Sequence, residues 1–384
     1  MNSATTTLWT SPEREPVVAR IAVGGDFLPA GNIEIATGGD WRGMSKSLAD
    51  HFQDISTSFV NLECCLDTGK LRPRPLSGLG DVVSAPADSL DYLKSIRAVA
   101  VGMANNHSLD FADAGVARTR AAISRRAMVP LGAGRALADP PEVFVWEGPG
   151  EVRVGFWAAA TATLDPATRR KAGVEPATLT RAGKALAEMK KLGARVSIAL
   201  LHAGCLRTSR PDPEQLRLMD SLAKFGFNIV AASHSHRIAG YGKPGGSSNG
   251  SPSFCFYGLG SLVSGYVSSP LEREGLVVVV GITRRGEMAS IEVRPVLLGA
   301  NGFGATPTPR VAREILERFG AISGEIADGS CERLFYHDIS QGLLRLYARD
   351  VQAAYRAGGI QALARKVSRI RTRHVRRLVH RVIG

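Results

Sequence analysis

Short apolar runs that end in polar residues recur along the first two thirds of the chain. The runs are rich in β-branched side chains, which is typical of buried strands. Between them lie stretches with the three- and four-residue apolar spacing of helices. This alternation predicts an α/β fold of layered sheets and helices. We expect strands over residues 17–23, 58–63, 98–104, 196–201 and 228–232, and helices over residues 85–96, 114–126, 176–192 and 213–225.

The apolar pattern changes after residue 304. Thr308 followed by Pro309 is a cap and first-turn pair that begins a helix. The spacing predicts two further helices, over residues 336–356 and 360–383. The expected organisation is therefore a flexible leader over residues 1–16, an α/β domain over 17–304 and a helical extension over 305–384.

Composition excludes several classes of protein. With 384 residues, 44% of them hydrophobic, the chain is long and apolar enough to bury a core without disulfides. Its five cysteines, with Cys64 and Cys65 adjacent, argue against a disulfide scaffold and for a reducing compartment. No apolar run reaches the ~18 residues of a membrane span, and residues 1–20 lack the apolar segment of a secretory signal. We expect a cytoplasmic protein.

The net charge of +13 is concentrated near the end of the sequence, because residues 361–384 carry eight Arg and Lys residues and no acid. They also carry a narrow apolar stripe at helical spacing. Such a helix docks on its own domain or binds an anionic surface, which would place the protein peripherally on a membrane. Nucleic acid is disfavoured as a partner because no aromatic side chains interleave with the arginines. The sequence does not indicate an oligomeric state.

Residues of metal-binding types follow the five predicted strands. In an open α/β sheet the carboxyl ends of the strands converge on one crevice, so these side chains are expected to meet. Carboxylate, amide and imidazole ligands together suit Mn, Fe or Zn, as one ion or as a pair that supports phosphoryl transfer. The candidate ligands are Asp26, Glu63, Asn106, His202, His234 and His236, and His107 is a candidate proton donor.

Six short motifs, taken in order, resemble those of the CapA (poly-γ-glutamate capsule biosynthesis) family over about residues 20–270. The resemblance implies a calcineurin-like metallophosphoesterase fold, which is a four-layer α/β/β/α sandwich. The motifs are Gly25-Asp26, Asn61-Leu62-Glu63, Ala104-Asn105-Asn106-His107-Ser108-Leu109-Asp110, His202-Ala203-Gly204, His234-Ser235-His236 and Tyr257-Gly258-Leu259-Gly260.

The same resemblance implies roles for individual residues. Asp26 and Glu63 would be carboxylate ligands, with Glu63 as the bridge between two metals. Asn106, His202 and His234 would bind one metal, His236 would bind the other, and His107 would be the general acid. The implied activity is metal-assisted hydrolysis or transfer in the biosynthesis of a capsule or a poly-γ-glutamate-type polymer, with Asp26, His107 and His202 as catalytic residues.

Four further residues are candidates for substrate binding. Arg207 and Arg210 follow His202 on the same predicted loop and could hold a phosphate or a carboxylate. Asn61 and Asn105 lie one or two residues before the candidate ligands Glu63 and Asn106. The expected substrate is an anionic polymer, a phosphoester or a peptide.

One departure from the metallophosphoesterase pattern keeps a second class of function open. Calcineurin-like enzymes carry a ligand histidine two residues after the first aspartate, whereas this chain carries Leu28. The motifs also resemble peptide epimerases of lasso-peptide pathways, which invert a Cα centre without a metal cofactor. Asp26 and one of His107, His202, His234 or His236 would then act as the acid–base pair. A non-catalytic binding protein is the third alternative.

Overall fold

The computed structural model describes residues 5–13, 15–31, 33, 38–74, 82–161, 163, 165–245 and 252–340. The chain divides into two compact units, Met1–Ala327 and Asp328–Gly384. The first unit contains both large sheets. Within the second unit, residues 331–340 are helical.

The first sheet is mixed and has nine strands. Its centre is parallel, from β2 through β3 and β6 to β7, and β17, β18 and β1 extend it with antiparallel pairs. β16 pairs with β2, and β19 pairs with β18. In chain order the strands are β1 (Thr6–Thr10), β2 (Val17–Leu28), β3 (Thr57–Leu62), β6 (Ala98–Gly102), β7 (Val129–Leu131), β16 (Ser261–Ser264), β17 (Glu274–Thr283), β18 (Met288–Leu298) and β19 (Gly304–Ala305).

The second sheet has six strands in the order β14-β15-β13-β12-β10-β9. Its four central strands run parallel, and β9 and β14 pair antiparallel at the edges. Its strands are β9 (Phe144–Glu147), β10 (Arg153–Ala160), β12 (Val196–His202), β13 (Ile229–Ser233), β14 (Tyr241–Gly242) and β15 (Phe254–Phe256).

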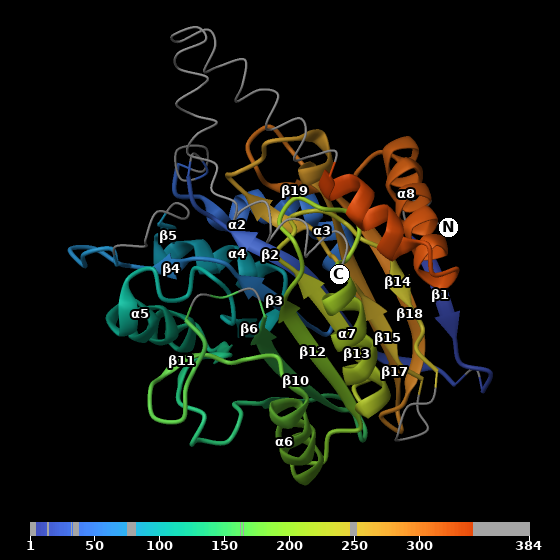
Figure 1. Cartoon of the computed structure of the whole chain (residues 1–384), viewed down its shortest axis with the longest axis horizontal. Helices are drawn as coiled ribbons and strands as arrows, with labels where there is room; N and C mark the ends of the chain where they lie inside the picture. The colour runs from blue at the N-terminus through green and yellow to red at the C-terminus, as the bar shows by residue number, and fades with distance from the viewer. Residues whose placement is uncertain are drawn as a thin grey trace, which may run out of the picture. The chain divides into compact units, whose positions relative to one another are not determined.

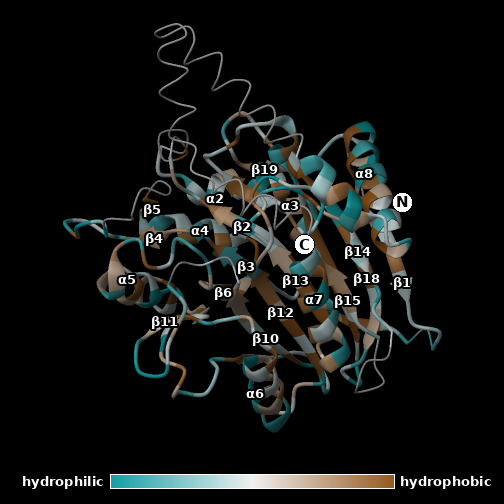
Figure 2. Cartoon of the chain, viewed as in Figure 1, coloured by the Kyte–Doolittle hydropathy of each residue, from teal (hydrophilic) through white to brown (hydrophobic). Residues whose placement is uncertain are grey.

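The two sheets pack face to face around a shared apolar core. Phe59 of the first sheet meets Phe156 of the second with ring centroids 5.1 Å apart. On β10 the side chains alternate, so Phe156 lies in the core between the sheets while Trp157 packs on the outer face. Figure 2 shows the central strands coloured as hydrophobic and many connecting loops as hydrophilic.

Helices cover the outer faces of this sandwich. α6 (Leu179–Lys191) and α7 (Pro213–Phe225) pack on the second sheet, and α4 (Leu90–Ser95) and α5 (Ala112–Arg125) pack on the first (Figure 1). The predicted four-layer α/β/β/α sandwich is therefore confirmed. The remaining elements are α2 (Trp41–Met44), η1 (Ser45–Leu48), α3 (Ala49–Phe52), β4 (Cys65–Leu66), β5 (Ser84–Ala85), η2 (Ala87–Ser89), β8 (Ala133–Arg135), β11 (Gly173–Val174), η3 (Pro270–Arg273) and α8 (Pro309–Ala327).

The sequence predicts that residues 1–16 form a flexible leader. This prediction is wrong for Thr6–Thr10, which forms the strand β1. This strand pairs antiparallel with β18, where Thr6 lies opposite Val293, and so extends the first sheet by one strand. A short threonine-rich segment gives little apolar signal, which is why the strand was not expected.

The first compact unit also continues beyond residue 304. Helix α8, which we expected in the helical extension, packs on the sandwich: Phe319 stacks on Tyr241 with ring centroids 5.5 Å apart, and Arg318 Nε donates to Glu274 Oε2 at 3.1 Å. The unit therefore ends at Ala327.

The other predicted helices are found in part. The helix predicted over residues 85–96 is found over Ala87–Ser95, where the 3₁₀ turn η2 leads directly into the α-helix α4. Most of the helix predicted over 336–356, and all of the basic helix over 360–383, lie outside the described residues. Within the described ranges, no helix combines the length and hydropathy that a membrane crossing requires.

Candidate metal centre

The candidate ligands lie at the carboxyl ends of strands from both sheets. Asp26 lies near the end of β2, Glu63 directly follows β3, and Asn106 lies in the turn after β6. In the second sheet, His202 is the last residue of β12, and the loop after β13 carries His234 and His236. The structure brings all six of these candidates together, as the strand-end argument predicted.

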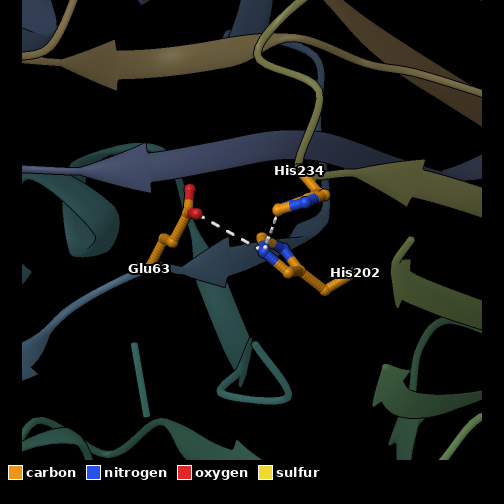
Figure 3. Close-up of side chains that lie close together, drawn as sticks. All are labelled: Glu63, His202 and His234. Atoms are coloured by element: carbon orange, nitrogen blue, oxygen red, sulfur yellow. Dashed lines mark hydrogen bonds and ion pairs between the residues drawn. The ribbon is translucent and has the colours of Figure 1, made fainter. Parts of the chain in front are cut away.

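Glu63, His202 and His234 form the first group whose ligand atoms all lie within 4.8 Å of one another. Figure 3 shows the Glu63 carboxylate and the His234 ring converging on the His202 ring. His202 Nε2 lies 3.4 Å from Glu63 Oε1 and 2.9 Å from His234 Nδ1. Asn106 joins this group, with its Oδ1 2.6 Å from the same His202 nitrogen.

His202 Nε2 therefore has more neighbouring acceptors than it can satisfy. An imidazole nitrogen carries at most one proton, and the Glu63 and Asn106 oxygens carry none. One proton cannot serve both oxygens and the His234 nitrogen. A cation among these atoms would use the surplus lone pairs, so the donor set fits a metal ion.

Asp26, Glu63 and His236 form a second group with the same spacing, and it shares Glu63 with the first. His236 Nδ1 lies 3.3 Å from Asp26 Oδ2 and 3.8 Å from Glu63 Oε2. Glu63 is buried, and its Oε2 has no hydrogen-bond partner in the described part of the chain. A buried carboxylate oxygen without a hydrogen bond is destabilising, so this atom also fits a ligand position. The arrangement matches a carboxylate shared between two ions.

Asn61 and Asn105 form a chain of hydrogen bonds to the candidate ligand Asp26. Asn61 Nδ2 donates to Asp26 Oδ1 at 2.7 Å, and Asn105 Nδ2 donates to Asn61 Oδ1 at 3.1 Å. Both side chains are buried, and their amides are used inside the protein. The sequence predicts that these two residues bind substrate, whereas the structure places them where they orient Asp26 and the end of β3.

His107 lies beside the ligand groups and is bound by Asp110. His107 Nδ1 lies 2.9 Å from Asp110 Oδ2, which also accepts a bond from the Val83 backbone N–H at 2.7 Å. Burial lowers the pKa of His107, but the hydrogen bond to Asp110 and the charges of Glu63 and Asp110 outweigh it, so the pKa is raised. Sequence reasoning gave Asp110 no role, although it stands three residues after His107 in the most specific motif.

Burial and mutual charge set the protonation of the ligands. Burial alone would raise the pKa of Asp26, but the hydrogen bond and charge of His236 and the charge of His202 hold it well below its usual range. Burial and the His202 charge lower the pKa of His234. Burial also opposes protonation of His236, yet the negative charges of Glu63 and Asp26 raise its pKa to about 9. The raised pKa favours a charged His236 imidazole beside the two carboxylates.

The loop that carries His234 and His236 is held in a strained conformation. Both residues have positive φ angles, 113° and 55°, which cost about 1–3 kcal/mol each for residues other than glycine. The His234 backbone N–H donates to Asp26 Oδ2 at 3.1 Å, which ties this loop to β2. Strain of this kind persists where surrounding contacts hold it and is common at functional sites.

The two candidate substrate-binding arginines lie in different surroundings. Arg210 forms a two-bond ion pair with Glu325 of α8, with distances of 2.6 and 2.7 Å. Arg207 lies beside the ligand loop, where its backbone N–H donates to Ser235 O at 2.9 Å. Arg207 is thus placed next to the ligands by a contact with the loop that carries His234 and His236, whereas Glu325 engages the Arg210 guanidinium.

Solved structures that resemble this chain include three with low sequence identity. The 5′-nucleotidase precursor from Thermus thermophilus is 15% identical with a TM-score of 0.43, and the match covers 79% of this chain and 58% of that one. The 5′-nucleotidase from Candida albicans is 10% identical with a TM-score of 0.40 and the same two coverages. The protein TT1561 of Thermus thermophilus is 14% identical with a TM-score of 0.36, covering 72% of this chain and 98% of that one. This chain thus spans little more than half the length of either 5′-nucleotidase.

A comparison with curated proteins finds none that matches. The family whose sequence model matches is described as bacterial capsule synthesis protein PGA_cap, and the match covers residues 20–266. These residues include every candidate ligand, all of the second sheet and five strands of the first sheet, β2, β3, β6, β7 and β16, except the first residues of β2. The chain therefore belongs to the PGA_cap family of bacterial capsule synthesis proteins.

Proposed function

We propose that the protein is a metal-dependent hydrolase or transferase that acts on a phosphoester or a related bond in the biosynthesis of a capsule or poly-γ-glutamate-type polymer. The observation that carries this proposal is the pair of ligand groups that share Glu63. Family membership supports the capsule-related role.

Each ligand group would hold one divalent ion. Asp26, Glu63 and His236 would hold one, and Glu63, His202 and His234, with the Asn106 oxygen, would hold the other. This mixture of carboxylate, imidazole and amide donors suits Mn, Fe or Zn. When bound, such ions lower the pKa of water and neutralise negative charge on a group being transferred.

His107 would supply the proton to the leaving group. Its Nδ1 is bonded to Asp110, which leaves Nε2 as the atom that can release a proton. The raised pKa keeps more of the imidazole protonated near neutral pH. Asp110 would act as a positioning residue because it fixes the orientation and tautomer of His107.

The surroundings of Asp26 favour this function over metal-independent epimerisation. An epimerase needs a base that can reach the Cα proton of a peptide. Asp26 is fully buried, accepts bonds from the Asn61 amide and the His234 backbone N–H, and lies 3.3 Å from His236. Its low pKa makes it a weak base and a good cation ligand.

Removal and return of metal tests the proposal. We expect the protein to hydrolyse a chromogenic phosphoester such as bis(4-nitrophenyl) phosphate, to lose this activity after dialysis against a chelator, and to regain it with Mn²⁺. A metal-free protein that epimerises a peptide at full rate would instead establish the alternative. Full phosphoester hydrolysis without metal would contradict the proposed mechanism.

A further inference from the structure

A second charged cluster, Arg207, Arg237 and Glu272, lies beside the ligand loop. Glu272 is buried and accepts bonds from the backbone N–H and the hydroxyl of Ser268 at 2.8 and 2.7 Å. Its Oε1 lies 3.5 Å from Arg237 Nη2 and 3.7 Å from Arg207 Nε. One fixed carboxylate is therefore shared by two guanidinium groups.

The two arginines come from the loops that carry the ligands. Arg237 directly follows His236, and Arg207 follows the β12 end that carries His202. The Arg207 backbone N–H donates to the carbonyl of Ser235, the residue between His234 and His236. The cluster thus borders the candidate metal centre.

The cluster has more positive charge and more donors than its partners use. Two guanidinium groups face one carboxylate, which leaves one positive charge in excess. Arg237 Nε is buried and has no hydrogen-bond partner among the described residues. The Arg207 side chain is 56% exposed, and its one ion pair within the described part of the chain is the 3.7 Å contact with Glu272. Arg237 Nη2 also donates to Ser269 Oγ at 3.2 Å. The exposed Arg207 guanidinium therefore has donors open to a further acceptor, and Arg237 beside it adds positive charge and one donor that its neighbours do not use.

We propose that Arg207 and Arg237, held by Glu272, form an oxyanion subsite that receives a phosphate or carboxylate group next to the metal centre. Guanidinium groups bind such oxyanions through paired, charge-assisted hydrogen bonds. That the oxyanion belongs to the substrate rests on the proposed function, whereas the subsite itself rests on the two arginines. Arg210 is not part of it, because Glu325 engages its guanidinium.

Calorimetric titration of the full chain with inorganic phosphate, and separately with acetate, tests the subsite. We expect Arg207→Gln and Arg237→Gln each to weaken binding of the preferred anion about tenfold, and Arg207→Lys to weaken it less because the charge remains. Arg310→Gln is the matched control, because it removes the same charge from a side chain that is 89% exposed in α8. The anion that binds more tightly, phosphate or acetate, identifies the chemical group that the subsite binds.

Metal content measured on the same samples separates this inference from the proposed function. Normal metal uptake with equal anion affinity in wild type, Arg207→Gln and Arg310→Gln would overturn the subsite and leave the function standing. Anion binding that depends on Arg207 in a protein that takes up no metal would support the subsite and overturn the function. Because Arg207 is largely exposed, its variant is expected to fold and so decides the matter even if Arg237→Gln is unstable. Absence of binding by both anions would also overturn the subsite.

Discussion

His107 depends for its chemistry on one neighbour. The 2.9 Å contact between His107 Nδ1 and Asp110 Oδ2 fixes the imidazole in one orientation, and the carboxylate charge stabilises its protonated form. Asp110 belongs to neither ligand group. Its effect on catalysis can therefore be separated from its effect on metal binding.

Replacing Asp110 by Asn is expected to move the pH profile of hydrolysis. A general acid must be protonated, so activity falls as the pH rises through the pKa of His107. Loss of the carboxylate lowers that pKa, so the inflection of kcat/KM on the basic side should move to lower pH. His107→Gln should lower kcat about 10²–10⁴-fold. Unchanged profiles in Asp110→Asn, with normal metal content, would contradict the assignment.

Single ligand residues at strand ends could be predicted from the sequence, but the residues that contact them in the folded chain could not. Asp26, Glu63 and His202 stand out because residues of ligand type end several apolar runs of one chain, in the order of the motifs of a known family. Glu272 gave no such signal, since its partner Arg207 is 65 positions away and the pair forms only in the folded chain. Asn61 was assigned to substrate because residue type alone does not show that its amide is buried.

At the level of elements, β1 and α8 complete the sandwich where the sequence predicted a leader and an extension. β1 covers the open edge of β18, and α8 places Ile315 and Phe319 in the core. Both boundaries were misplaced because a composition change does not reveal packing. By contrast, α7 was predicted over its observed bounds, since Asp212 caps it and Pro213 begins it.

Phe319→Ala should lower the free energy of unfolding by about 3–5 kcal/mol, because it removes a buried ring that stacks on Tyr241. Arg310→Ala, on the exposed side of the same helix, should change it by less than about 0.5 kcal/mol. Urea unfolding of both variants provides the measurement. If both variants lower the free energy of unfolding by the same small amount, α8 contributes little to the stability of the sandwich.

His51 joins α3 to β18 and makes the stability of the fold depend on pH. Its Nε2 bonds to Pro295 O at 2.6 Å, and Thr306 Oγ1 lies 3.0 Å from Nδ1. Burial lowers the pKa of His51 from 6.5, and the positive charge of Arg294 lowers it further. The hydrogen bond to Pro295 and the charges of Asp50 and Asp54 raise the pKa but do not outweigh burial.

Because the unfolded chain binds this proton more readily, the contribution of His51 is complete above pH 6.5 and is lost as the pH falls below that value. His51→Gln should therefore destabilise the protein at neutral pH, and its difference from wild type should shrink in acid. Denaturant unfolding over this pH range measures the difference. A gap that widens in acid would contradict the sign of the pKa shift.

For the whole molecule, the important feature is that two sheets bring their strand ends to one place (Figure 1). β2, β3 and β6 supply Asp26, Glu63 and Asn106, and β12 and β13 of the other sheet supply the histidines. The sequence predicted the convergence and the class of fold. It could not assign strands to sheets, because pairing between distant strands depends on contacts that no local pattern encodes.

Because both ligand groups contain Glu63, loss of its carboxylate should weaken metal binding by both groups. The direct measurement is metal content per chain after loading with Mn²⁺ and removal of unbound ions. We expect two ions per chain in wild type, fewer than one in Glu63→Gln, and two in Asp110→Asn, which alters a buried carboxylate outside both ligand groups. Wild-type protein that retains no metal, or Glu63→Gln that retains two ions, would contradict the account.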